Sequence, residues 1–148
     1  MPEVCESGII EASAEKVWSV LRDFSGASNW APTMVSSALE RGQAADQVGA
    51  VRRLVFESGA EVLETLIALS DHERYFRYAM PSTGSMPISE YHGRVRVIPV
   101  TDSDRALVEW SGNFAVREGS ADDVCAWVRG VYKSGIAGMR TYIEQLPA

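Results

Sequence analysis

The segment ISEYHGRVRVIPV, residues 88–100, gives the clearest indication of the fold, because apolar and polar side chains alternate along it. One face carries Tyr91, Gly93, Val95 and Val97. The other face carries Glu90, His92, Arg94 and Arg96. A two-residue period with one apolar face is typical of a β-strand that covers a core. We therefore predict a strand here, with its charged face in solvent.

A second segment, ALVEWSGNFAV at 106–116, alternates in the same way, with Val108, Trp110, Gly112 and Phe114 on its apolar face. Shorter strand-like segments at 34–40, 50–57 and 73–80 lie between turn-forming residues. This spacing predicts an antiparallel meander. A glycine on each apolar face lets a sheet bend sharply or lets another group approach its backbone. We therefore expect a curved, concave sheet.

The segment EVLETLIALS, residues 61–70, fits two structures. With a helical period Val62, Leu63, Leu66 and Ile67 share a face, and Glu, Leu and Ala favour helices. In a strand, Glu64 instead shares a face with Val62, Leu66 and Ala68, which places a carboxylate in an apolar row. The local sequence leaves this choice open.

Two helices are predicted at the ends of the chain. The first runs over 14–23, with Ser13 as its N-cap. The second begins after Ser120 and continues for about 24 residues, with apolar positions at helical spacing. Three glycines weaken this long helix, so we expect them to permit close packing or to leave room for a guest: Gly130, Gly135 and Gly138.

The composition restricts the possible functions. The 148 residues suit one domain over 1–148, and the net charge of −6 disfavours binding to nucleic acid. No apolar run approaches the roughly 20 residues of a membrane span, and the first ten residues do not resemble a secretory signal. We expect a cytoplasmic protein, monomeric or homodimeric. With two histidines and no metal-type cysteine spacing, we predict neither a metal site nor a cofactor.

The order of these elements, with the segments ETLIALSD, EYHGRVRVIP, VEWSGNF and VYKSGIAGMRTYIE, resembles the START-type helix-grip (SRPBCC) superfamily. The chain is most similar to bacterial polyketide cyclase/dehydrase and lipid-transport-like proteins, and more distantly to plant abscisic-acid receptors and birch-pollen-type allergens. The resemblance spans nearly the whole chain. It implies an α+β fold in which a curved seven-stranded antiparallel sheet surrounds a long C-terminal helix, with two short helices after strand one. It also implies that residues 61–70 form a strand.

The resemblance further implies a cavity between sheet and helix, open at one end. By similarity to the receptors, Glu64, Tyr91 and Arg52 match polar groups of that cavity. Strand and helix periods add Tyr78 and these apolar or aromatic positions, with Trp30 as a further wall residue: Leu54, Phe56, Leu66, Met80, Val95, Val108, Trp110, Phe114, Val128, Tyr132 and Ile136. The receptor lysine that meets a ligand carboxylate falls at Ala31, so the resemblance does not extend to acid binding of that kind.

Two classes of function fit these residues. In the first, the protein binds a small hydrophobic molecule such as a polyketide, an isoprenoid or a lipid. In the second, it is a cyclase, dehydratase or isomerase, with Glu64 as general acid or base and Tyr78 or Tyr91 as hydrogen-bond donor. Glu64 also has a structural interpretation, as a buried carboxylate satisfied by Arg52 or by water. The tyrosines could equally be core aromatics, and a partner-binding module with a vestigial pocket is a weaker third hypothesis.

Overall fold

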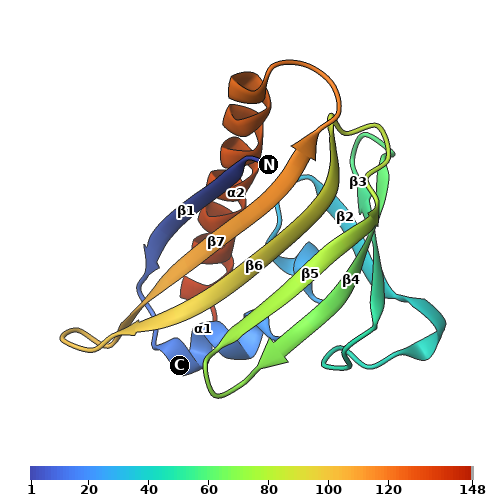
Figure 1. The fold of residues 1–148 in the computed structure, drawn as a ribbon. Coiled ribbons are helices and arrows are strands. Elements are labelled where there is room, and N and C mark those ends of the chain that lie inside the picture. Colours follow the sequence, from blue (N-terminus) through green and yellow to red (C-terminus); the bar gives the residue numbers. More distant parts are fainter. Residues whose placement is uncertain (148) are drawn as a thin grey trace.

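A computed structural model describes residues 1–147 and shows seven strands in one antiparallel sheet, in the spatial order β1-β7-β6-β5-β4-β3-β2. The strands are β1 (Glu3–Ile10), β2 (Met34–Leu39), β3 (Val51–Phe56), β4 (Glu61–Ser70), β5 (Tyr75–Ser82), β6 (Ile88–Val100) and β7 (Arg105–Val116). The helices are α1 (Ala14–Leu21), α2 (Ala121–Glu144) and two 3-10 turns, η1 (Ala27–Asn29) and η2 (Glu40–Gly42). This arrangement confirms the predicted helix-grip fold (Figure 1).

The strand interpretation of residues 61–70 is correct. Strand β4 pairs with β3 on one side, where Arg52 lies opposite Glu64, and with β5 on the other, where Leu66 lies opposite Tyr78. The two neighbouring strands satisfy the backbone hydrogen-bonding groups of β4, and its apolar face, with Val62 and Leu66, is buried in the core. Tertiary context thus outweighs the helix-favouring composition of this segment.

The predicted boundaries differ most at two elements. Helix α1 ends at Leu21 rather than at residue 23, because Arg22 caps it and the Asp23 amide already bonds Val20 O in a tighter turn. Strand β5 begins at Tyr75, after a turn in which Arg74 adopts a positive φ of 55°, and it continues to Ser82. The last strand residues therefore lie beside the loop that leads into β6.

Helix α2 lies across the concave face of the sheet, alongside β1 and β7 (Figure 1). Its N-cap Ser120 accepts a hydrogen bond from the Asp123 amide, as the sequence predicts. Helix α1 contacts β6, β7 and α2, so it closes one end of the space between sheet and helix. Within residues 1–147, no helix is both long and apolar enough to cross a membrane.

Glycines on the concave side make room for aromatic rings. Gly93 and Gly112 are cross-strand partners, and a Cβ on either would collide with a tyrosine: Tyr78 at Gly93, Tyr132 at Gly112. On α2, a Cβ on Gly135 would collide with the Trp110 ring. The glycines thus let the rings lie directly against the backbone of sheet and helix.

At the other two glycines of α2, Gly130 and Gly138, we expect substitution by alanine to have opposite effects on stability. A Cβ on Gly138 would collide with the backbone carbonyl of Trp30 and with Pro32, whereas nothing lies within 4 Å of a Cβ on Gly130. We expect Gly138→Ala to destabilise the protein by about 1–3 kcal/mol through overpacking. Gly130→Ala, the matched control, gains about 1 kcal/mol from helix propensity. Urea unfolding measures both, and equal effects of the two substitutions would refute the packing assignment.

Candidate functional site

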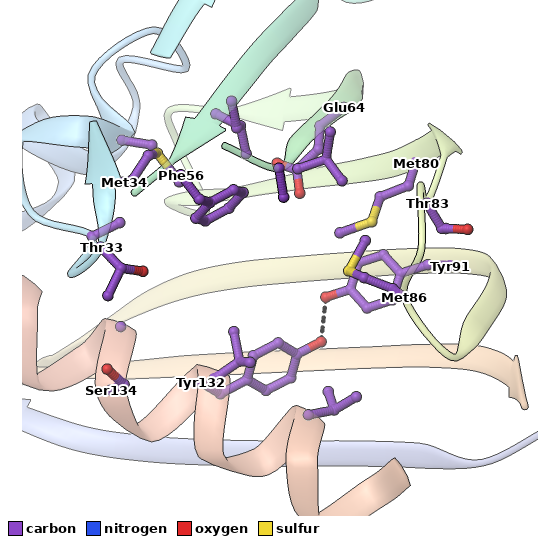
Figure 2. Close-up of a pocket in the computed structure, with 18 of the residues that line it drawn as sticks. Thr33, Met34, Phe56, Glu64, Met80, Thr83, Met86, Tyr91, Tyr132 and Ser134 are labelled. Atoms are coloured by element: carbon purple, nitrogen blue, oxygen red, sulfur yellow. Dashed lines mark hydrogen bonds between the residues drawn. The ribbon is translucent and has the colours of Figure 1, made fainter. Parts of the chain in front are cut away.

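A cavity of about 530 Å³ lies between the concave face of the sheet and α2 (Figure 2). Most of its wall is apolar or aromatic, and its polar groups are few. A volume of several hundred Å³ with this lining is typical of a small-molecule site.

Most of the predicted site residues line this cavity. They are Trp30, Arg52, Leu54, Phe56, Glu64, Tyr78, Met80, Tyr91, Val95, Trp110, Val128 and Tyr132. In Figure 2, Glu64 and Met80 approach the cavity from the sheet, and Tyr132 approaches it from α2. The structure thus brings the polar candidates of the sequence together in one space.

Four predicted positions lie in the core instead of on the cavity wall: Leu66, Val108, Phe114 and Ile136. The correction has a simple reason, because alternation predicts the face of a strand but not the depth along it. The ring of Phe114 stacks behind Tyr91, at a centroid distance of 6.4 Å. Ile136 packs against Gly8 on β1, whose partner on β7 is Val108.

Several wall residues were not predicted. Val62 and Phe76 share strand faces with Glu64 and Tyr78, so the strand period carried the signal for both. Met34, Thr83 and Met86 lie at strand ends or in the β5–β6 loop, where no period indicates the direction of a side chain.

The mouth of the cavity lies where its lining becomes exposed. One side is the exposed face of α2, with Trp127 and Val131 each 43% exposed. The other side comes from the β3–β4 turn and from the β5–β6 loop at residues 83–86.

Arg52 and Glu64 form an ion pair on the cavity wall, with side chains only 7% and 5% exposed. Arg52 donates from Nε at 2.9 Å and from Nη2 at 2.5 Å, and both bonds reach Glu64 Oε1. A third bond runs from Arg52 Nη1 to the carbonyl of Phe24 at 3.0 Å, and the guanidinium lies 3.9 Å from the Phe24 ring centre. The structural interpretation of Glu64 is therefore correct as far as its Oε1 is concerned.

The second carboxylate oxygen, Glu64 Oε2, has no hydrogen-bond partner among residues 1–147, and it is not an enclosed unsatisfied atom. Because Glu64 lines the cavity, this oxygen is an available acceptor there. Arg52 fixes the carboxylate through the other oxygen. One side chain thus combines a structural bond with a free polar group.

Three tyrosine hydroxyls form a hydrogen-bonded chain at the cavity. Tyr78 Oη lies 2.8 Å from Tyr91 Oη, and Tyr91 Oη in turn bonds Tyr132 Oη (Figure 2). At the far end, Trp110 Nε1 donates to Tyr78 Oη at 2.9 Å. The indole of Trp110 also stacks on Tyr132, with ring centres 4.5 Å apart. Packing and hydrogen bonding therefore hold all four rings in one arrangement.

The tyrosine hydroxyls remain protonated well above neutral pH. Burial raises the pKa of Tyr78, Tyr91 and Tyr132, because water no longer solvates the phenolate. The negative charge of Glu64 further raises the pKa of Tyr78 and Tyr132. The three groups thus act as neutral O–H donors and acceptors.

Within residues 1–147, no group of three His, Cys, Asp or Glu side chains is placed to hold a metal ion. Both cysteines are free, and Cys5 is exposed while Cys125 is partly buried. Besides Glu64, Arg52 and the three tyrosines, the cavity wall carries Glu61 and these hydroxyl side chains: Thr33, Thr83, Ser85 and Ser134.

The buried ion pair predicts a strong effect of removing one partner. We expect Arg52→Met to destabilise the protein by about 3–5 kcal/mol, because Glu64 keeps a buried charge without its partner. The double variant Arg52→Met/Glu64→Leu recovers most of this loss. Arg53→Met is the matched control, since Arg53 pairs with Glu40 and Glu61 at the surface, and it causes little change. Urea unfolding that shows no recovery in the double variant would contradict this assignment.

The tyrosine chain predicts a loss of stability at alkaline pH. Unfolded tyrosines release their protons near pH 10, whereas the raised pKa values keep the folded ones protonated to higher pH. Above about pH 10 the unfolded state binds fewer protons, so the free energy of unfolding falls as pH rises. Urea unfolding between pH 9 and 11 measures the slope. It should be shallower in Tyr91→Phe, and identical slopes would contradict the prediction.

Comparison with solved structures supports the fold. XoxI from Bacillus cereus is 30% identical, covers 98% of this chain and 97% of its own, and superimposes with a TM-score of 0.87. Norcoclaurine synthase from Thalictrum flavum, in complex with dopamine and hydroxybenzaldehyde, is 16% identical over 99% of this chain and 88% of its own (TM-score 0.73). The di-domain ARO/CYC BexL of the BE-7585A biosynthetic pathway is 17% identical over 97% of this chain and 47% of its own (TM-score 0.76).

A comparison with curated proteins finds no match. A family model described as polyketide cyclase/dehydrase and lipid transport matches residues 1–144, which is nearly the whole chain. The fold, the cavity under α2 and this match agree with the resemblance in the sequence. The chain belongs to the polyketide cyclase/dehydrase and lipid transport family.

Proposed function

We propose that the protein binds a small, largely apolar molecule in the cavity between the sheet and α2. The observation that carries this proposal is the cavity itself, about 530 Å³ with an apolar and aromatic wall and a mouth at the surface. Burial of apolar ligand surface against such a wall supplies the affinity, at roughly 25 cal/mol per Å². Membership of a family described by cyclisation and lipid transport supports the same conclusion.

A second candidate function is catalysis on such a molecule. The observation that favours it is the free Oε2 of Glu64 in the same cavity as the tyrosine hydroxyls. A fixed carboxylate can accept a proton from a bound carbon or oxygen acid. A neutral phenol can stabilise the negative charge that then develops on a carbonyl oxygen. A cyclase, dehydratase or isomerase reaction would use both groups.

Filling the cavity tests the binding proposal. Met80 points into the cavity from β5 (Figure 2), so Met80→Trp occupies ligand space. We expect it to weaken binding of Nile red, a neutral apolar fluorophore, at least tenfold in a fluorescence titration. Ile67→Trp is the matched control, because Ile67 is 45% exposed and does not line this cavity. Equal binding by wild type, Met80→Trp and Ile67→Trp would place the dye elsewhere and contradict the proposal.

Glu64→Gln distinguishes the two candidates once a ligand that is converted has been found. Catalysis by Glu64 predicts that the variant retains binding of that ligand and loses its conversion. Unchanged turnover in Glu64→Gln would exclude Glu64 as the acid or base.

A further inference from the structure

The hydroxyl hydrogens of the tyrosine chain can be counted. Tyr78, Tyr91 and Tyr132 each carry one O–H hydrogen, and two hydrogen bonds link their oxygens. Each such bond uses one hydrogen, whichever oxygen donates. Trp110 donates its own N–H to Tyr78, so it consumes no hydroxyl hydrogen. One of the three O–H groups therefore has no acceptor among the three tyrosines.

The donor-to-acceptor direction of the hydrogen bonds between the tyrosines identifies the hydroxyl that keeps this hydrogen. Tyr78 is buried, and its oxygen already accepts from Trp110. The only acceptor within reach of its own hydrogen, among residues 1–147, is Tyr91 Oη. All three tyrosines line the cavity, but a hydroxyl that accepts from Trp110 is the stronger donor, so Tyr78 donates to Tyr91 and the free hydrogen belongs to Tyr91 or Tyr132. Because a hydroxyl that accepts a bond becomes a stronger donor, Tyr91 donates onward and the free O–H lies on Tyr132.

A buried donor without an acceptor costs free energy, so a ligand that supplies an acceptor gains more than one that does not. Among residues 1–147, the cavity wall offers no unpaired cation that could neutralise an anionic acceptor. Arg52, the only basic residue that this part of the chain places on the wall, is bonded to Glu64 and to the Phe24 carbonyl. A carboxylate ligand would bring an unpaired charge into an apolar space that already contains the Glu64 carboxylate.

We propose that the ligand is a neutral carbonyl compound, a ketone, aldehyde or ester, whose oxygen accepts the free hydroxyl hydrogen of the Trp110–Tyr78–Tyr91–Tyr132 chain. Free carboxylic acids are excluded as ligands at neutral pH. The Oε2 of Glu64 favours compounds that also carry a hydroxyl group. This inference rests on the proposed binding function and specifies the chemistry of the ligand.

Three naphthalenes of similar size test it: 2-acetylnaphthalene, 2-ethylnaphthalene and 2-naphthoate. Their affinities are measured at pH 7.5 for the wild type and for the triple variant Tyr78→Phe/Tyr91→Phe/Tyr132→Phe. Tyr142→Phe is the control, since Tyr142 lies on α2 outside the cavity. We expect the triple variant to bind the ketone about 3- to 10-fold more weakly than the wild type, which is the value of one hydrogen bond. Its affinity for the hydrocarbon should stay within about twofold of the wild-type affinity. In wild type we expect the carboxylate to bind at least tenfold more weakly than the nearly isosteric ketone.

The infrared spectrum of bound, carbonyl-labelled 2-acetylnaphthalene gives a readout that needs no variant. We expect its C=O stretch to lie below the frequency in hexane, as for a hydrogen-bonded carbonyl. A hexane-like frequency would overturn the inference, as would equal losses of ketone and hydrocarbon affinity or tight binding of 2-naphthoate. These outcomes would leave the binding function intact. If none of the three compounds binds, the binding proposal itself is contradicted, and this inference falls with it.

Discussion

Close packing of aromatic rings against glycine backbone is the constraint on which this structure depends. Tyr78 and Tyr132 occupy the space that side chains at Gly93 and Gly112 would fill, and Trp110 does the same at Gly135. The rings therefore pack directly against the backbone of the sheet and of α2. This brings three hydroxyls to one place, and beyond the rings a cavity remains between α2 and the outer strands.

Glu64 and the tyrosine chain each combine a structural role with one free hydrogen-bonding position. Glu64 is bonded to Arg52 through one oxygen and offers the other. The tyrosine chain satisfies its internal bonds and retains one hydrogen. Buried polar networks are tolerated when their members are satisfied. A ligand that completes the two free positions would relieve the remaining cost, which links the stability of the fold to recognition.

Much of the fold could be predicted from the sequence, and the chemistry of the site only in part. Alternation at 88–100 and 106–116 identified β6 and β7, and the resemblance resolved β4, whose residues alone fit helix or strand. Alternation also placed Tyr78, Tyr91 and Trp110 on one face. Alternation could not distinguish residues of the cavity wall from residues of the core, as Leu66 and Phe114 show. The strand and helix periods give the direction of a side chain but not its position along the element. The tyrosine chain joins three separate elements, β5, β6 and α2, so no local pattern could reveal it.

The methionine methyl groups provide the most direct test of the central claim that a neutral carbonyl ligand binds in this cavity. Met34, Met80 and Met86 line it, whereas Met1 is exposed and Met139 is buried in the core. In a titration with 2-acetylnaphthalene, followed by NMR of the methionine methyls, the account predicts ring-current shifts at Met34, Met80 and Met86 and none at Met1 or Met139. Saturable binding that leaves the three cavity methyls unshifted would contradict it.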